Sequence, residues 1–280
     1  MFLSQKSFIE IKPTLYLVST PIGNLSDITL RALQILKSVD FILAEDTRIS
    51  KKLLNFYDIK KPIISFYQYN QQKRLNKILQ LLTSNHNLAL ISDAGTPLIS
   101  DPGDLLVQEV QTRGFHTIAI PGVTAFLTAF ITSSFKLPLI FLGFLPRSQN
   151  KKKLFLLKYQ FCEATLLIYE SSYRVLETLQ LLKKIYGNRN ISLARELTKK
   201  FEQIINTSLE EILKKELFLK GEYVIVIEGF TKSSMLYENF SLLQHIQFYL
   251  KQGFSEKESF HKVAKERKIS KREIYKKYKI

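Results

Sequence analysis

The clearest fold signal in this chain is the segment Leu88-Ala-Leu-Ile-Ser-Asp93-Ala-Gly95-Thr96-Pro97-Leu-Ile-Ser-Asp101-Pro102-Gly103. Its apolar start predicts a buried strand, and the pattern from residue 104 onwards predicts a helix. The loop between them is longer than a bare connection needs, and its glycines and prolines restrict the backbone while leaving amide and carbonyl groups for a ligand. In an open α/β sheet, ligands bind beyond the carboxyl ends of the strands, where such a loop lies. The alternative is an ordinary connecting loop whose acids have no function.

Strand, loop and helix patterns of the same kind repeat on both sides of this segment. Further strands are expected at residues 14–19, 41–44, 62–66, 117–121, 139–142, 164–169, 191–194 and 223–227. In the first domain, repeated units of this type predict a parallel sheet. We therefore expect a two-domain α/β protein, with domains at 1–135 and 136–232 and a helical tail at 233–280. The cleft between the two domains is the expected place for a site.

The composition is that of a soluble globular protein with an unusual charge. The 280 residues are 45% hydrophobic and carry a formal net charge of +16. Such a surplus favours binding to polyanions such as nucleic acid or an anionic membrane, although a lysine-rich genomic composition is an alternative cause. The sequence shows no secretory signal and no apolar run of membrane-spanning length. Since Cys162 is the single cysteine, no disulfide forms within the chain, and we expect a cytoplasmic protein.

Positive charge is concentrated in the tail, where residues 251–280 hold eleven Lys or Arg against four Glu. Ser255 to Glu258 and Ser270 to Glu273 match the S-x-x-E capping box, which predicts two short helices joined by a tight turn. Such a pair resembles a helix-turn-helix module that contacts nucleic acid. The cations expected to contact RNA are Lys262, Lys265, Arg267, Lys268, Lys271 and Arg272. The alternatives are a solvated helix pair, or packing of the tail's apolar residues on the second domain or a dimer mate.

Two further charged segments follow predicted strands. Glu45-Asp46-Thr47-Arg48 stands at the end of a buried strand, where charges are costly unless they face a cleft. The alternative is that Asp46 starts a helix and pairs locally with Arg48. In the second domain, Lys151 to Lys153 are predicted to lie in an exposed basic turn.

The chain lacks several familiar nucleotide-binding and hydrolase motifs. There is no G-x-x-x-x-G-K-[ST], no G-x-G-x-x-G after the first strand and no G-x-S-x-G, which argues against common nucleotide-binding and hydrolase sites. The four histidines show no metal-ligand spacing. What remains is a set of Gly/Pro/Thr loops at strand ends, flanked by acids. Such loops suit an uncharged or cationic cofactor that is held by backbone groups.

Seven short motifs stand in the order found in one known family. They are Ser19-Thr-Pro-Ile-Gly-Asn-Leu, Ala44-Glu-Asp-Thr-Arg48, Ser92 to Gly103, Ile120-Pro-Gly-Val-Thr-Ala125, Gly143-Phe-Leu-Pro146, Glu170-Ser-Ser-Tyr-Arg174 and Ala194-Arg-Glu-Leu-Thr198. On these motifs the chain resembles the bacterial 16S ribosomal RNA 2′-O-ribose methyltransferases, part of the tetrapyrrole methylase-like group. The resemblance covers essentially the whole chain, including the basic tail.

The resemblance implies a homodimeric two-domain α/β enzyme that binds S-adenosylmethionine in the interdomain cleft. The substrate it implies is a decoding-centre cytidine of 16S ribosomal RNA in the small ribosomal subunit. Carried over by position, the cofactor-binding residues are Pro21, Ser92, Asp93, Ala94, Gly95, Thr96, Leu98, Pro121, Gly122, Val123, Thr124, Ala125, Leu142, Gly143 and Phe144.

Methyl transfer to a ribose hydroxyl requires a group that accepts the hydroxyl proton as the new bond forms. The candidates are Asp46, Asp93 and Asp101, and no metal is required. Arg48 and Arg195 are available to hold RNA phosphates. Two other classes stay open. A tetrapyrrole C-methyltransferase would share the cofactor loops without needing the basic tail, and a noncatalytic RNA-binding protein would need the tail without the loops.

Overall fold

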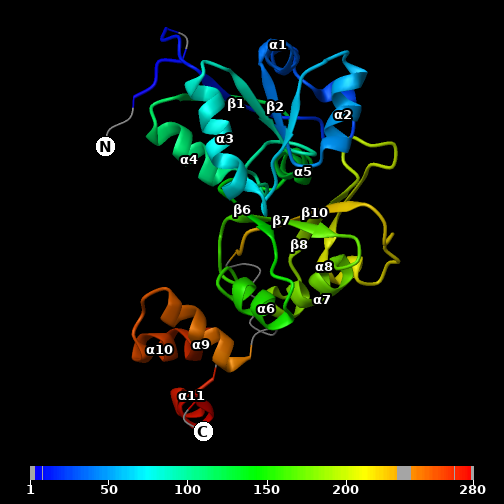
Figure 1. Cartoon of the computed structure of the whole chain (residues 1–280). Coiled ribbons are helices and arrows are strands. Elements are labelled where there is room, and N and C mark those ends of the chain that lie inside the picture. Colours follow the sequence, from blue (N-terminus) through cyan, green and yellow to red (C-terminus); the bar gives the residue numbers. More distant parts are fainter. Residues whose placement is uncertain (1–3, 8, 232–240, 268, 279–280) are drawn as a thin grey trace. The chain divides into compact units, whose positions relative to one another are not determined.

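The computed structural model describes residues 4–7, 9–231, 241–267 and 269–278 (Figure 1). The chain divides into two compact units, which interleave along the sequence. The first comprises Met1–Thr132, Leu193–Ile205 and Gly221–Val224; the second comprises Ser133–Ser192, Asn206–Lys220 and Ile225–Ile280. The linear boundaries after residues 135 and 232 stay predictions. Among the described residues, no helix has both the length and the apolar character needed to cross a membrane.

Five parallel strands form the first sheet, in the order β3-β2-β4-β1-β5. The strands are β1 Thr14–Val18, β2 Phe41–Ala44, β3 Ile63–Ser65, β4 Leu88–Ile91 and β5 His116–Ile120. The helices between and after them are η1 Leu25–Asp27, α1 Leu30–Ser38, α2 Thr47–Phe56, α3 Gln71–Thr83, α4 Asp104–Thr112 and α5 Ala125–Ser133. The predicted parallel sheet is therefore confirmed.

Helices cover both faces of this sheet, because successive strand side chains point to opposite sides. Leu15 and Leu43 pack with leucines of α3 and with residues of α4 in one buried cluster. Val18 and Ile42 pack in a second cluster with residues of α1 and α2. The sheet is thus buried on both faces, and only its strand ends and the loops there are available to a ligand.

The strand order makes β4 and β1 neighbours whose following loops diverge. After β1 the chain leads to α1 on one face of the sheet, and after β4 it leads to α4 on the other face. Divergence of this kind opens a crevice beyond the carboxyl ends of the two strands, where open α/β sheets bind ligands. The loop at residues 92–103 starts at this crevice.

The second sheet also has five strands, in the order β6-β7-β10-β8-β9. These are β6 Leu139–Phe144, β7 Thr165–Ser171, β8 Asn190–Arg195, β9 Gln203–Ser208 and β10 Glu222–Ile227. Helices α6 Gln149–Leu157, α7 Val175–Tyr186 and α8 Leu209–Ile212 lie together on one face of it (Figure 1). Strand β9 was not predicted, because it lies at the sheet edge and its residues are exposed or half-buried.

The prediction of a basic turn at residues 151–153 is wrong, because all three lysines lie in α6, and the predicted exposure is wrong for the central one. Lys152 lies in α6 and is completely buried. Its Nζ donates to Glu177 Oε1 at 2.5 Å and to Thr178 Oγ1 at 3.3 Å. A buried ammonium group is tolerated when it is paired and hydrogen-bonded in this way. Lys151 and Lys153 are exposed on either side of it.

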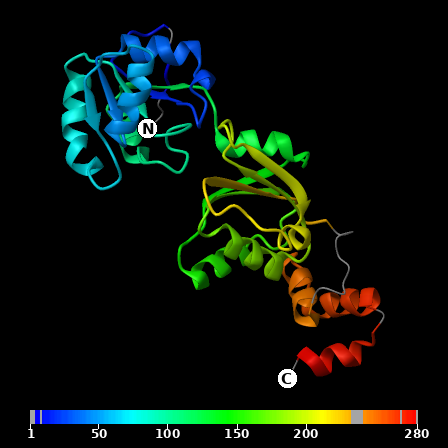
Figure 2. The same cartoon turned by 90° about the vertical axis from the view of Figure 1, so that its right-hand side faces the viewer.

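The C-terminal segment contains three described helices, α9 Leu242–Lys251, α10 Glu256–Arg267 and α11 Lys271–Tyr278 (Figure 2). Both predicted capping boxes are confirmed. Ser255 Oγ accepts the Glu258 N–H at 3.3 Å while Glu258 accepts the Ser255 N–H at 2.9 Å. Ser270 and Glu273 make the same pair of bonds at 3.3 and 2.9 Å. Helix α9 was not predicted, although it too begins with a capping box, from Ser241 to Gln244.

The three C-terminal helices share a buried apolar cluster. Phe260, Val263 and Ile274 lie in it together with residues of α9. Phe230 and Phe161, which precede these helices in the chain, belong to or pack against the same cluster. The apolar residues of the two predicted helices therefore pack within the second unit, which is one of the alternatives given for the tail.

Candidate active site

Hydroxyl groups join the loops that follow β4, β1 and β5. Ser19 Oγ lies 3.0 Å from Thr96 Oγ1, which lies 2.9 Å from Thr124 Oγ1. The backbones of Thr20 and Gly95 also exchange hydrogen bonds, at 2.8 and 3.1 Å. Three segments far apart in the sequence thus form one connected group of loops at the crevice.

The loop at residues 92–103 is held in an unusual backbone conformation. Gly95 and Gly103 have φ angles of +83° and +139°, and Leu98 and Ser100 have +68° and +72°. Residues with a Cβ rarely adopt positive φ, at a cost of roughly 1–3 kcal/mol each. Such strain persists only where surrounding contacts impose it, and it concentrates at functional sites.

The loop at residues 121–125 packs closely against the loop that follows β1, and Gly122 makes this close approach possible. A Cβ added to Gly122 would lie 2.6 Å from Ser19 Cβ, so a side chain at this position would force the two loops apart. The residues predicted to bind the cofactor in this unit differ in exposure. Ala94, Pro121 and Gly122 are exposed; Asp93, Thr96, Leu98, Val123, Thr124 and Ala125 are half-buried; Pro21, Ser92 and Gly95 are buried.

Asp46 has a structural role at the start of α2. Its side chain accepts the Arg48 N–H at 2.8 Å and caps the helix. Arg48 Nη2 also donates to Asp46 Oδ2 at 2.6 Å. These bonds from Arg48 lower the pKa of Asp46 to about 2. The cap and ion pair are the alternative interpretation of this segment, and they make Asp46 a weak base.

Two further carboxyl groups crowd the same strand ends. Asp93 Oδ1 accepts the Asp46 N–H at 3.0 Å. Burial raises the pKa of Asp93, and the hydrogen bond from Asp46 opposes that rise. Burial also raises the pKa of Glu45, with the charges of Asp93 and Asp46 adding to the effect. Glu45 was not among the predicted catalytic acids, although it directly follows β2, the strand that neighbours β4.

Asp101 is the acid best suited to accept a proton. Burial first, and then the charge of Glu45, raises its pKa to about 6. Asp101 lines a narrow gap, too small to hold a water molecule, together with Glu45, Phe66, Leu90, Ile91, Ser92, Pro97 and Pro102. A carboxyl group with a pKa near neutrality can release and take up protons under working conditions, which a general base requires.

The predicted cofactor residues of the second sheet lie at an irregularity in β6. The pairing of β6 with β7 shifts register between Phe141 and Phe144, which places Leu142 and Gly143 in a bulge. Gly143 has a φ of +64°, a conformation that favours glycine. Bulges interrupt strand pairing and occur often beside active sites.

The motif from Glu170 to Arg174 has a structural role, which depends on the contacts of Arg174. Its Nη2 donates to the carbonyl oxygens of Leu145 and Pro146, at 3.1 and 2.9 Å. Glu170 is buried, and its carboxylate lies 3.6 Å from Arg174 Nε. This pair holds the segment that directly follows the bulge of β6.

The cations predicted to bind RNA have different environments. Lys262 Nζ lies 4.5 Å from the centre of the Phe254 ring and 5.3 Å from that of Tyr249. Arg267 donates to His245 Nδ1 at 3.0 Å and to the Ser241 carbonyl at 3.2 Å, which attaches α10 to α9. Lys265, Lys271 and Arg272 are exposed, and Lys268 lies outside the described residues. Arg195 is half-buried at the end of β8.

The sequence pattern described as Tetrapyrrole (Corrin/Porphyrin) Methylases matches residues 14–213. The chain belongs to this family. A Bacillus subtilis (strain 168) relative, named ribosomal RNA small subunit methyltransferase I, is 40% identical over 274 residues, or 95% of this chain and 94% of that protein. A Mycoplasmopsis pulmonis (strain UAB CTIP) relative of the same name is 47% identical over 76% of this chain and 96% of its own length.

Solved structures of the family share the fold at much lower identity. A cobalt precorrin-4 methyltransferase is 16% identical, covers 77% of this chain and 94% of its own, and has a TM-score of 0.57. A diphthine synthase is 13% identical over 77% of this chain and 90% of its own, with a TM-score of 0.61. The predicted tetrapyrrole methylase-like fold is thereby confirmed.

Membership of this methylase family makes the protein an S-adenosylmethionine-dependent methyltransferase. The loops of the first unit fit that cofactor, which carries a positive sulfonium centre, an ammonium group and ribose hydroxyls. The carboxyl group of Asp93, which is half-buried in this loop, suits the positive charges. The exposed backbone at Pro121 and Gly122 is accessible to polar groups, and a Cβ at Gly122 would disturb it.

Proposed function

We propose that the protein methylates ribosomal RNA of the small subunit, at the ribose 2′-hydroxyl of a decoding-centre cytidine. The observation that carries this proposal is about 40% identity over nearly the full length of proteins named ribosomal RNA small subunit methyltransferase I. The predicted cytoplasmic location and homodimer accompany the proposal as expectations from the same resemblance.

The cofactor supplies an electrophilic methyl group, and the crevice must orient the attacking oxygen in line with it. Alignment of this kind supplies much of the rate of a displacement reaction. We assign cofactor binding to residues 92–98, 121–125, 142–144 and Pro21. The hydroxyl chain of Ser19, Thr96 and Thr124 keeps the first-unit loops in place.

Asp101 is assigned as the general base of this reaction. A ribose hydroxyl is a weak nucleophile until its proton is removed, and a carboxylate of raised pKa accepts that proton more readily than an ordinary one. We assign Asp46 a structural role instead, because its cap and its ion pair with Arg48 lower its pKa to about 2. Asp93 is assigned to the cofactor-binding loop and not to proton transfer, since its Oδ1 already accepts the Asp46 N–H.

The test is transfer of a labelled methyl group to purified small subunits that lack the modification, followed by mapping of the product. Ribose 2′-O-methylation protects the adjacent phosphodiester bond from alkaline cleavage, because that cleavage needs the free hydroxyl. We expect one protected position in the decoding-centre RNA. Label on a base, which leaves alkaline cleavage intact, would refute ribose methylation, and absence of label from the subunit would refute the RNA substrate.

A further inference from the structure

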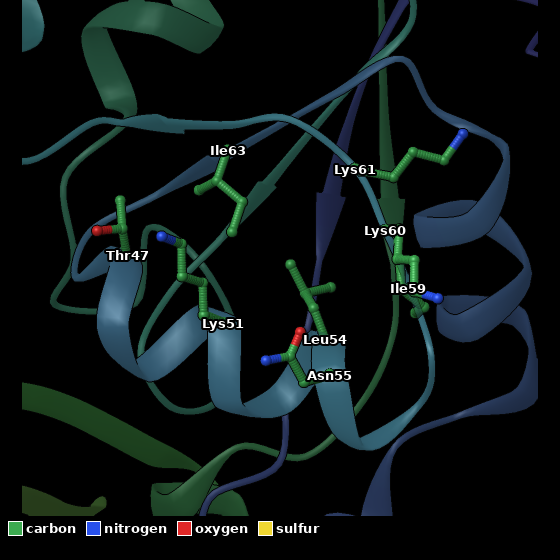
Figure 3. A pocket seen from close by; sticks show the side chains of 8 residues that line it. All are labelled: Thr47, Lys51, Leu54, Asn55, Ile59, Lys60, Lys61 and Ile63. Carbon is green, nitrogen blue, oxygen red and sulfur yellow. The ribbon is translucent and has the colours of Figure 1, made fainter.

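A groove outside the loop cluster runs between α2 and the edge strand β3. It has a volume of about 470 Å³ and is lined by Thr47, Lys51, Leu54, Asn55, Ile59, Lys60, Lys61 and Ile63. Figure 3 shows Lys51 and Asn55 on successive turns of α2, with Ile63 opposite and Lys60 and Lys61 towards the other end. Three apolar residues, three lysines and two uncharged polar residues make up this lining.

The lysines of this groove have little negative charge beside them. The eight lining residues include no acid. In the described part of the chain, neither Lys51 nor Lys61 forms an ion pair, and Lys60 pairs with Asp58 at 3.2 Å. Both partners of that pair are more than four-fifths exposed, and pairs of this kind are worth little in water. The groove thus presents positive charge that the fold does not use.

The shape of the groove favours a chain of phosphates over a single anion. Thr47 and Asn55 lie eight positions apart on α2, or roughly 12 Å along its axis. This length is greater than that of a single phosphate group, so the groove can contact more than one phosphate of a strand. Lysine binds phosphate as a mobile point charge, which suits contact with a backbone of any sequence. The apolar part of the lining can accept ribose carbons.

We propose that the groove of Lys51, Lys60 and Lys61 binds the phosphodiester backbone of the RNA substrate. The inference rests on the proposed function for the identity of the RNA, and it adds a contact surface to the tail and to Arg48 and Arg195. Lysines beside an edge strand also have another use, since they prevent edge-to-edge pairing with a second chain. The experiment separates these two roles.

The experiment compares two triple variants of the full chain. Lys51→Ala/Lys60→Ala/Lys61→Ala removes the groove charges. Its control, Lys37→Ala/Lys73→Ala/Lys77→Ala, removes equal charge from exposed positions on α1 and α3 of the same unit. Binding to small subunits that lack the modification is measured at a series of salt concentrations. Calorimetric S-adenosylmethionine affinity and gel filtration are measured alongside.

We expect the groove variant to reduce the slope of log affinity against log salt by about 2, because each phosphate contact contributes ~0.7 on single-stranded RNA. The control is expected to change that slope by less than half as much, and both variants keep wild-type cofactor affinity. Equal slopes for the two variants overturn the proposal. Self-association of the groove variant with an unchanged slope also overturns it, because that result would show that the lysines prevent pairing of the edge strand with a second chain. Failure of the wild-type protein to methylate small subunits would overturn the proposed function instead.

Discussion

The acid-rich strand ends of the first sheet and the basic C-terminal helices each carry an excess of charge of one sign, but they hold it differently. In the crevice, burial and neighbouring carboxylates raise the pKa values of Asp101 and Glu45. In the tail, Lys262 lies over two aromatic rings and Arg267 is hydrogen-bonded to α9. Charges that are kept at an energetic cost mark reactive sites, whereas charges satisfied within the chain also serve the fold.

The largest expected effect tests this contrast within the crevice. Asp101→Asn should lower the rate of single-turnover methyl transfer by roughly 10²-fold or more, because the amide cannot accept the hydroxyl proton. Asp46→Asn is the matched control, since asparagine caps a helix about as well as aspartate and the rate should stay within a few-fold. Equal losses in the two variants would show that the acids act together and that Asp101 has no separate role.

The pH dependence follows from the same group. The folded pKa of Asp101, about 6, lies above its ordinary value of 3.8, so the rate should rise about tenfold per pH unit below 6 and level off above it. Because the folded pKa exceeds the ordinary one, the ionised carboxylate destabilises the folded state, and this destabilisation is complete above pH 6. Asp101→Asn should therefore raise the melting temperature at neutral pH, and the gain should shrink as the pH falls from 6 to 4. A pH-independent gain would mean that charge is not its cause.

The close contact between the loops after β1 and β5 is tested by Gly122→Val, which places carbon atoms where Ser19 already lies. We expect at least a tenfold loss of S-adenosylmethionine affinity, or about 1.4 kcal/mol, by calorimetry. Gly114→Ala is the control, because a Cβ there would meet nothing within 4 Å, although Gly114 has a φ of +78° that alanine adopts only with strain. It should reduce stability without changing affinity. The same affinity loss in both variants would contradict the loop assignment.

The smallest effects concern the tail. Lys265→Ala/Lys271→Ala/Arg272→Ala should flatten the salt dependence of small-subunit binding by about 2 units and leave the melting temperature near that of the wild type. Arg267→Ala should do the opposite, destabilising the tail by about 1–3 kcal/mol through its lost hydrogen bonds while changing the slope little. A large slope change for Arg267→Ala alone would show that this residue contacts RNA in spite of its partners on α9.

Much of the local structure could be predicted from the sequence. The capping boxes at Ser255 and Ser270 close within one helical turn, so the residues themselves specify the geometry. The strand and helix patterns of the first sheet likewise depend on short-range periodicity. The prediction for Lys152 was wrong because its environment depends on Glu177 and Thr178 of another helix, which lies well beyond its own segment.

The reactive geometry required knowledge of which strands are neighbours. Because β4 lies between β2 and β1, the ends of β2 and β4 bring Glu45 near Asp101, and this proximity helps raise the pKa of Asp101 to about 6. The motifs around both acids are visible in the sequence, but their mutual repulsion is not. Strand neighbours are set by burial of two helical layers against one sheet, a property of the whole unit. The roles of Asp46 and Asp101 therefore diverge in the folded protein, although both are carboxylates in polar loops of the sequence.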